Sequence, residues 1–476
     1  MHLALISVGI LIIIGASIGI GFARSKRRNS TFCAGSQAQF TCDAGGKKEC
    51  FNSVVVVVSF EKSVPSLILQ KLIISNFISH EKALIGRIVI SSDMIEWRNT
   101  PARWTPEDNV FIHDEPIKES EIEKMAGSIQ SRPLCLEKPC WELIVLGSIV
   151  GRAGESTSGV IFKYHHALAD GSTMLEKMLA RAVPRDSNQS ISPVLPVSRK
   201  VRKASYPFGL ISCLKSVYSL LTLRPDPPGL FRAFTIRKPG DKINVALSSS
   251  LSLAEVKLIA KKRHEENGFS VNDVLTAIFT RAFRSFTLNN KKFTGKMEDI
   301  KSVVWVNLGN KSDSEAWGNS RLGFGYCQLP LSVEDPRACL RECHSRLDRL
   351  KHSMDAAVIN VALKFIGLLP IGLGKRIARI TADMASVSMS NMAGPVKPVI
   401  WPVIPGETII DSTINPAIRS IHFATSPPFH FGPLVSVMSY CGYFHISISA
   451  RDEVLSHSDL QAILSEIPNA AKDLLL

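Results

Sequence analysis

No zinc-finger spacing, no aromatic RNA-binding motif and no internal repeat stand out in this chain of 476 residues. The sequence is basic, with a formal net charge of +14, which favours anionic partners such as nucleic acid, an anionic membrane face or a polyphosphate ligand. The basic residues, however, do not gather in a single tract. We therefore expect no nucleic-acid partner.

Charged side chains are missing from the first 22 residues, MHLALISVGILIIIGASIGIGF. About 20 apolar residues suffice for a helix to cross a bilayer. The run is followed by Arg24, Lys26, Arg27 and Arg28, whereas a cleaved signal peptide carries its positive charge ahead of a shorter apolar stretch. We expect a single-pass anchor with residues 3–22 in the membrane. A cleaved signal peptide is the weaker alternative.

The positive-inside rule places the rest of the chain in the cytoplasm, on the endoplasmic reticulum or, alternatively, on a lipid droplet. Potential N-glycosylation sites at Asn29, Asn188 and Asn310 would then stay unused.

The ten cysteines match no spacing typical of a zinc site, so no metal site is expected. Cys33, Cys42 and Cys50 lie in a glycine-rich segment and could form disulfides only if that segment were extracellular. Cys339 and Cys343 are one helical turn apart, and without a second pair they are expected to be buried core thiols.

With 45% hydrophobic residues the chain can bury a large core, and its length favours two or three domains. Apolar runs at 53–59, 141–146 and 159–164 predict strands of a first half, and the first of them is apolar on both faces. The expected order is a membrane anchor at 1–23, a tether at 24–52, a first subdomain at 53–183, a crossover linker at 184–242 and a second subdomain at 243–476.

The crossover is rich in proline, which excludes long regular elements. Within it, residues 209–221 are apolar and too short to span a bilayer, so they predict either a membrane-surface helix or a helix packed on the core.

The second half carries two helix-start signals, SLAE at 252–255 and SVND at 270–273, which both fit a capping box. Strands are expected at 302–306, 434–438 and 443–449, and amphipathic helices at 334–353 and 457–475. The whole predicts a mixed α/β protein in two halves.

The motif that carries chemistry is HHALADG at 165–171, which has the form H-H-x-x-x-D-G. It follows the predicted strand and precedes residues with helical apolar spacing, which is where ligands commonly bind in α/β proteins. Neutral imidazole suits a general base, and adjacent side chains on an extended backbone point to opposite faces. Asp170 would order the turn and pair with a cation. Gly171 would relieve the steric limits at the point where the backbone turns into the helix. A simple strand-to-helix turn with a capping aspartate is the alternative.

HHALADG resembles the active-site motif of the acyl-CoA-dependent acyltransferases, which include chloramphenicol acetyltransferase and condensation domains. Further segments in the same order are similar to the wax ester synthase/diacylglycerol acyltransferase family: RPL at 132–134, KPCWE at 138–142, SVNDV at 270–274, SNMAGP at 390–395 and SYCG at 439–442. The matches cover about residues 130–455. The resemblance implies a two-domain chloramphenicol-acetyltransferase-like α/β fold.

By this resemblance His166 is the general base, and His165, Asp170 and Gly171 are supporting residues. A fatty alcohol or diacylglycerol hydroxyl would give its proton to His166 and attack the thioester of acyl-CoA. Acyl-CoA is thus a substrate, and no cofactor, metal or covalent intermediate is implied.

Four further residues are candidates for contact with the substrate or the developing oxyanion: Asn272, Asp273, Ser390 and Asn391. Each pair has a structural alternative, a capped helix start for the first two and a Gly-Pro turn for the last two. Likewise Trp141 is expected in the core, and Gly442 is expected in a turn or bulge.

Ala393, Cys140 and Cys441 depart from the family's usual residues, and the apolar N-terminus is not part of the soluble bacterial pattern. Two other functions stay open at this point. The acceptor could be an amine or a small alcohol, or the chain could be a non-catalytic lipid-binding protein. An intact His166 with Asp170 and Gly171 argues against the second of these.

Overall fold

The computed structural model describes residues 49–185, 210–262, 268–308, 322–366, 371–401 and 416–476, with short gaps at 51, 92–93, 101–102, 291–294 and 429 and at several positions between 227 and 239. The predicted membrane anchor, most of the tether, and Cys33 and Cys42 lie outside these residues. Within the described ranges, no helix is both long and apolar enough to cross a membrane.

The first of two large sheets contains all three strands predicted for the first half. Its order is β16-β2-β9-β8-β5, and β6 also pairs with β8. The bounds are β2 (Ser53–Phe60), β5 (Val110–His113), β6 (Ile117–Lys118), β8 (Trp141–Val150), β9 (Ser156–His165) and β16 (Ile418–Thr425).

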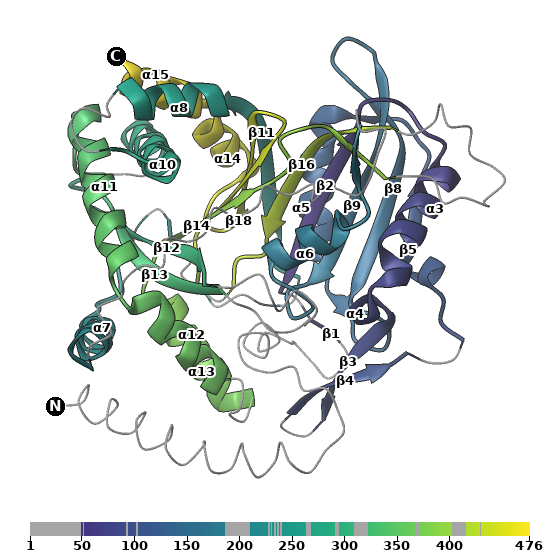
Figure 1. Cartoon of the computed structure of the whole chain (residues 1–476), viewed down its shortest axis with the longest axis horizontal. Coiled ribbons are helices and arrows are strands. Elements are labelled where there is room, and N and C mark those ends of the chain that lie inside the picture. Colours follow the sequence, from purple (N-terminus) through teal and green to yellow (C-terminus); the bar gives the residue numbers. More distant parts are fainter. Residues whose placement is uncertain are drawn as a thin grey trace.

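Strand β2 is buried on both faces, as its apolar run predicts. Val54, Val56 and Val58 pack with α3 (Ser66–Asn76) and α6 (Gly171–Met178), whereas Val55 and Val57 pack with α5 (Ile122–Ser131). Trp141 is buried in the same core, which confirms its predicted place. Figure 1 shows this sheet in purple and blue, with β16 in yellow-green beside β2 at its edge.

The second sheet has the order β11-β18-β17-β14-β12-β13 and confirms the three strands predicted for the second half. Its pairs are antiparallel except β12–β14 and β14–β17, which are parallel. The bounds are β11 (Ile243–Ser252), β12 (Ile300–Asn307), β13 (Leu322–Leu329), β14 (Val387–Ala393), β17 (Leu434–Tyr440) and β18 (Tyr443–Arg451).

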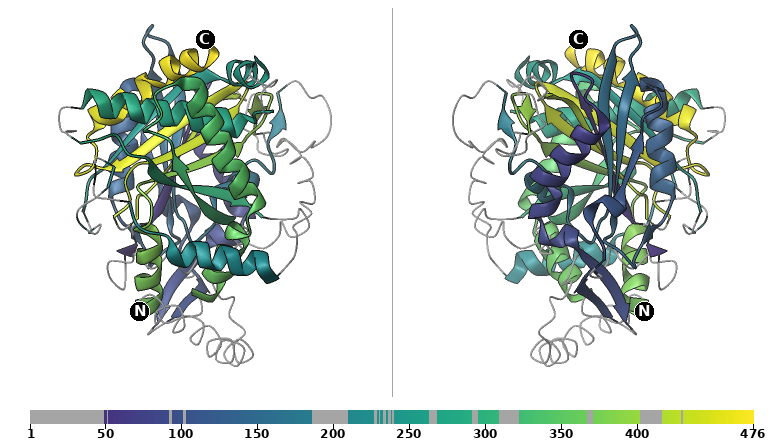
Figure 2. Two further views of the ribbon diagram at one scale, coloured as in Figure 1. Left: turned by 90° about the vertical axis from the view of Figure 1, so that its left-hand side faces the viewer. Right: turned by 90° about the vertical axis from the view of Figure 1, so that its right-hand side faces the viewer.

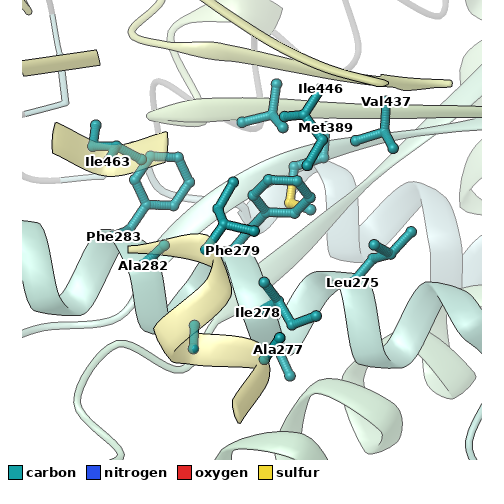
Figure 3. Close-up of a cluster of buried hydrophobic side chains, with 14 of the residues drawn as sticks. Leu275, Ala277, Ile278, Phe279, Ala282, Phe283, Met389, Val437, Ile446 and Ile463 are labelled. Atoms are coloured by element: carbon teal, nitrogen blue, oxygen red, sulfur yellow. The ribbon is translucent and has the colours of Figure 1, made fainter. Parts of the chain in front are cut away.

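One face of the second sheet is covered by helices around the long helix α10 (Val271–Asn289). Phe279 and Phe283 of α10 lie in one core with Met389, Val437 and Ile446 of the sheet (Figure 3). The surrounding helices are α8 (Leu253–Lys262), α11 (Pro336–His352), α14 (His457–Ser465) and α15 (Ile467–Leu475). In Figure 2 the yellow C-terminal helices lie at the opposite end of the molecule from the dark blue β3–β4 hairpin.

Helix α10 begins as its sequence predicts. The Ser270 side chain accepts a hydrogen bond from the Asp273 backbone N–H, and the Asp273 carboxylate accepts one from the Ser270 N–H. Ser252 likewise accepts from the Glu255 N–H at the start of α8. Cys339 and Cys343 are buried in α11, which confirms them as core thiols.

The C-terminal helix predicted over 457–475 is wrong as one element, because it is two helices joined at Glu466. Pro468 lies in the first turn of α15, where its missing N–H costs nothing. The proline therefore allows a new helix to begin but not the previous one to continue.

The apolar segment of the crossover forms α7 (Leu210–Thr222), beside α12 (Asp355–Ile366), which in turn contacts α13 (Ile371–Ala382). Leu220 packs into the protein, and the Ser216 hydroxyl accepts a hydrogen bond from the Met354 N–H. Leu214 and Tyr218 stay 57% and 70% exposed. The helix is therefore packed on the protein along one side, and its membrane contact stays a prediction.

The remaining elements are short. Three two-stranded sheets pair β1 (Glu49–Cys50) with β7 (Leu134–Cys135), β3 (Gly86–Ser91) with β4 (Met94–Asn99), and β10 (Val183–Pro184) with β15 (Val399–Ile400). Helix α4 (Lys82–Ile85) and three 3-10 turns (Ile78–His80, Pro106–Asn109 and Glu119–Glu121) complete the described elements.

Strand β16 joins the two halves of the chain. Its residues lie in the predicted second subdomain, yet it pairs with β2 of the first sheet, Phe423 opposite Val56. The first sheet therefore contains a strand from near the C-terminus, so the predicted subdomain boundaries in the sequence do not separate the two sheets.

A two-residue turn joins β17 to β18, and both of its residues have positive φ: 49° at Cys441 and 84° at Gly442. The turn predicted at Gly442 is thus confirmed.

Asparagine, the residue of the similar S-Y-N-G segment, tolerates the left-handed region better than cysteine does. We expect Cys441→Asn to raise the free energy of unfolding by about 0.5 to 1 kcal/mol. Thermal unfolding measures this, and Cys441→Val should lower the midpoint; an asparagine variant no more stable than the valine variant would contradict the argument.

Candidate active site

The HHALADG motif begins at the last residue of β9, where this strand stops pairing with its neighbours β2 and β8. The His165 N–H donates to the Cys140 carbonyl, and the His166 N–H donates to the Asn52 carbonyl, both at 2.9 Å. The backbone of the histidine pair is therefore held from both neighbouring strands. Helix α6 begins five residues later, so the motif occupies a strand-to-helix turn, as predicted.

His165 is fully buried on the α5 face of the sheet, the same face as Lys163, whose ammonium donates to the Ile129 carbonyl. Its Nδ1 accepts a hydrogen bond from the Ala167 N–H at 3.1 Å. That bond places the ring proton on Nε2. Burial, followed by the charges of His166 and Lys163, lowers the pKa of His165 to about 3. The ring is thus neutral and holds the turn, consistent with a supporting role.

The His166 imidazole is enclosed by protein but keeps part of its surface accessible. Burial lowers the pKa of His166, while the nearby backbone of the same residue and the charge of Asp170 oppose that shift. A neutral imidazole can accept a proton from a hydroxyl group.

Asp170 caps helix α6. Its carboxylate accepts hydrogen bonds from the Thr173 N–H at 2.8 Å and from the Ser172 hydroxyl at 2.9 Å. Across the described residues no cation pairs with Asp170, so the expected ion pair is not found there. Its charge instead favours the protonated form of His166. The residue orders the turn, as predicted, and sets the local electrostatics.

Gly171 lies where the two halves of the molecule meet. A Cβ built on Gly171 would lie 3.0 Å from Sδ of Met392 in β14. Its φ is not positive, so the backbone conformation does not require glycine at this position, and a larger residue would press on the Met392 side chain. Leu168 and Ala169 pack in one cluster with Met438 and Tyr440 of β17. The motif therefore faces the second sheet.

The candidate residues of β14 point in opposite directions. Val387 and Met389 pack in the α10 core, whereas Met392 packs against the motif. Because side chains alternate along a strand, Ser390 shares the face of Met392, and Asn391 points toward α10. Of the two, Ser390 is the one on the motif side.

Asn272 and Asn391 meet at the start of α10, where the Asn391 amide donates to the Asn272 side-chain oxygen at 2.7 Å. Asp273 is fully buried and also binds His344 Nδ1 at 2.9 Å and Lys351 Nζ at 3.4 Å, both from α11. Burial would raise the pKa of Asp273, but the hydrogen bonds from His344 and Ser270 and the charge of Lys351 hold it below its usual range. An ionised carboxylate cannot donate to an oxyanion, so the geometry favours the capping role.

Sequence reasoning missed Met392 and a second histidine pair, His422 and His445. Met392 lies inside the recognised SNMAGP segment, but its contact with Gly171 depends on how the two sheets approach. The histidines could have been found as polar residues alternating with apolar ones in strand-forming runs, such as YFHISIS at 443–449.

Solved structures with a similar arrangement of elements show the fold. A wax ester synthase/diacylglycerol acyltransferase of Marinobacter aquaeolei VT8 superimposes with a TM-score of 0.62 at 15% identity, covering 92% of this chain and 97% of that one. A trichothecene 15-O-acetyltransferase of Fusarium sporotrichioides gives 0.60 at 12% identity, covering 94% and 96%. The fold is therefore the two-domain α/β fold found in acyltransferases, as predicted.

Two family models match the sequence: the wax ester synthase/diacylglycerol acyltransferase catalytic domain over residues 113–222, and the WS/DGAT C-terminal domain over residues 317–474. Wax ester synthase/diacylglycerol acyltransferase 11 of Arabidopsis thaliana is 25% identical over 377 residues, 67% of this chain and 73% of that protein. A putative diacylglycerol O-acyltransferase of Mycobacterium tuberculosis is 23% identical over 351 residues, 64% and 68%. The chain belongs to the wax ester synthase/diacylglycerol acyltransferase family and is an acyltransferase.

Proposed function

We propose that this acyltransferase moves a fatty acyl group from acyl-CoA to a long-chain alcohol, to diacylglycerol, or to both, with His166 as the general base. The observation that carries the proposal is the place of His166: its backbone N–H is held at the end of β9 by the Asn52 carbonyl, and burial lowers the pKa of its ring, so the ring is neutral near pH 7. The family relationship supports the choice of substrates.

In the proposed reaction the acceptor hydroxyl gives its proton to the His166 imidazole while its oxygen attacks the thioester carbonyl. A tetrahedral oxyanion forms, and collapse breaks the carbon–sulfur bond. The thiolate of CoA leaves with the proton from His166, so the base is regenerated. Ser390, on the face of β14 that meets the motif, is the proposed donor to the oxyanion.

The acceptor is tested by competition. Purified full-length protein receives palmitoyl-CoA with equimolar hexadecanol and dioleoylglycerol, and a parallel reaction contains a small amine. We expect wax ester, triacylglycerol or both, with no amide. Amide as the main product would contradict the proposed acceptor class, and no product with any acceptor would contradict the proposed donor.

The charge of Asp170 should help to set the pH below which kcat/KM falls. Because protonated His166 cannot act as a base, kcat/KM falls as the pH drops through the pKa of His166, which burial places below the usual value of roughly 6.5. Asp170→Asn keeps the helix cap, since asparagine and aspartate cap equally well, but removes the charge that raises this pKa. We expect the acid limb of the kcat/KM profile to move to lower pH with little change in thermal stability. A limb that stays in place or moves to higher pH would exclude this coupling.

Residues 3–22 are proposed to anchor the protein in the membrane of the endoplasmic reticulum, with the lipid droplet as the alternative, and with the catalytic body in the cytoplasm. The support is the uncharged run and the basic cluster that follows it. We expect Asn188 and Asn310 to carry no glycan in a eukaryotic host. A shift in mobility after glycosidase treatment, lost in Asn188→Gln or Asn310→Gln, would place the body in the lumen instead.

A further inference from the structure

A serine and two histidines from both sheets meet away from the HHALADG motif. Ser249 of β11 lies between His445 of β18 and His422 of β16. Its Oγ is 2.8 Å from His445 Nδ1 and 3.2 Å from His422 Nε2. The two rings are perpendicular, with centroids 5.0 Å apart. Strand β16 lies against β18 at this point (Figure 1).

The serine is accessible and the histidines are not. His422 and His445 are 7% and 4% exposed, whereas Ser249 is exposed. A register shift between Ser248 and Leu251 interrupts the pairing of β11 with β18, and this irregularity turns Ser249 outward. Ser249 is thus an exposed residue whose hydroxyl lies directly against two buried imidazoles.

Both imidazoles are neutral near pH 7. Burial, together with the neighbouring ring of His445, lowers the pKa of His422 to about 3. Burial lowers the pKa of His445 to about 4, although a hydrogen bond to the backbone of Tyr440 opposes the shift. A neutral His445 can accept the Ser249 proton through Nδ1, and the bond to Tyr440 orients its ring.

A nucleophile within hydrogen-bond reach of a base, with the base oriented by a third group, is the arrangement of covalent catalysis. We propose that Ser249 is a second acyl acceptor of this protein, with His445 as its base and an acyl thioester or an activated ester as its substrate. The choice of acyl-CoA as the thioester rests on the proposed function.

In this step the Ser249 hydroxyl gives its proton to His445 Nδ1 and attacks the thioester carbonyl. The carbon–sulfur bond breaks, the thiolate takes the proton from His445, and the products are free CoA and an O-acyl ester of Ser249. Water or an alcohol can then release the acyl group in the same way. The step needs no further reactant and does not pass through His166.

The test uses the full chain carrying His166→Ala, so that transfer by the proposed base is removed. It is incubated with palmitoyl-CoA and no acceptor, and the peptide that contains β11 is sequenced by tandem mass spectrometry. We expect a palmitoyl group on Ser249 that is absent in Ser249→Ala. Ser250→Ala is the matched control, because Ser250 lies in the same irregular segment but its Oγ bonds only Ser248 among the described residues. This variant should acylate normally.

A fluorophosphonate probe tests the nucleophile without acyl-CoA, so this result stays independent of the proposed function. We expect Ser249→Ala to abolish labelling and His445→Gln to slow it on the order of 10²-fold. Labelling that is equal in wild type and Ser249→Ala, together with no acyl group on Ser249, would overturn the proposal. Ser249 and the two histidines would then only join three strands by hydrogen bonds. Ester synthesis that survives His166→Ala would instead contradict the proposed base, whatever happens at Ser249.

Discussion

Replacing His166 by alanine should reduce ester formation from palmitoyl-CoA by roughly 10²- to 10⁴-fold, the contribution typical of a general base. The variant loses the imidazole that is proposed to accept the hydroxyl proton. Its fold should survive, because the bond that fixes this residue to β2 is made by its backbone N–H to the Asn52 carbonyl. Steady-state rates at saturating acyl-CoA measure the effect, and thermal unfolding checks the fold.

His352→Ala is the matched control, since this histidine is 74% exposed on α11. Its rate should equal that of the wild type. Partial recovery of the His166→Ala rate on addition of free imidazole would locate the loss in proton transfer. A His166→Ala enzyme that retains the wild-type rate would contradict the mechanism.

Removal of the Asp226 carboxylate should lower the free energy of unfolding by about 3 to 5 kcal/mol, the usual cost of breaking a buried ion pair. Asp226 lies within the crossover and is 3% exposed. It accepts the Lys301 ammonium at 2.6 Å, the Lys301 N–H at 2.7 Å and the Ser386 hydroxyl at 2.8 Å. Lys301 belongs to β12, and Ser386 directly precedes β14. One carboxylate therefore fastens the crossover to two adjacent strands of the second sheet.

The matched control is a surface ion pair of the same length. Arg185 and Glu61 also lie 2.6 Å apart, but their side chains are 50% and 32% exposed. Arg185→Ala should cost less than about 1 kcal/mol, because solvent screens the pair. Denaturant unfolding of both variants compares the two costs. If Asp226→Ala is no less stable than Arg185→Ala, burial of the Asp226–Lys301 pair does not add to the free energy of unfolding.

The sequence predicted those parts of the fold whose signals are local. The run of five valines at 54–58 predicted a strand with two apolar faces, and the SVND segment predicted the start of α10. Both were confirmed, because alternation and capping depend only on neighbouring residues. The break at Glu466 was missed although Pro468 signals it.

Properties that depend on how distant segments meet were not predictable in the same way. Residues 418–425 give no sign that they pair with β2 rather than with the second sheet. The directions of Ser390 and Asn391 follow only once the register of β14 is known. Among the candidate residues the motif was placed correctly at a strand end, but the approach of Met392 to Gly171 could be seen only in the folded chain.

The position of β16 also bears on the order in which the protein is built. A ribosome releases β2, β8 and β9 early, but β16 leaves only after most of the remaining chain has been made. Until then the valine-rich β2 is the open edge of an incomplete sheet, and an apolar edge of this kind pairs readily with other chains. We therefore expect the nascent chain to depend on a chaperone that covers β2, and truncations that end before residue 418 to aggregate during synthesis.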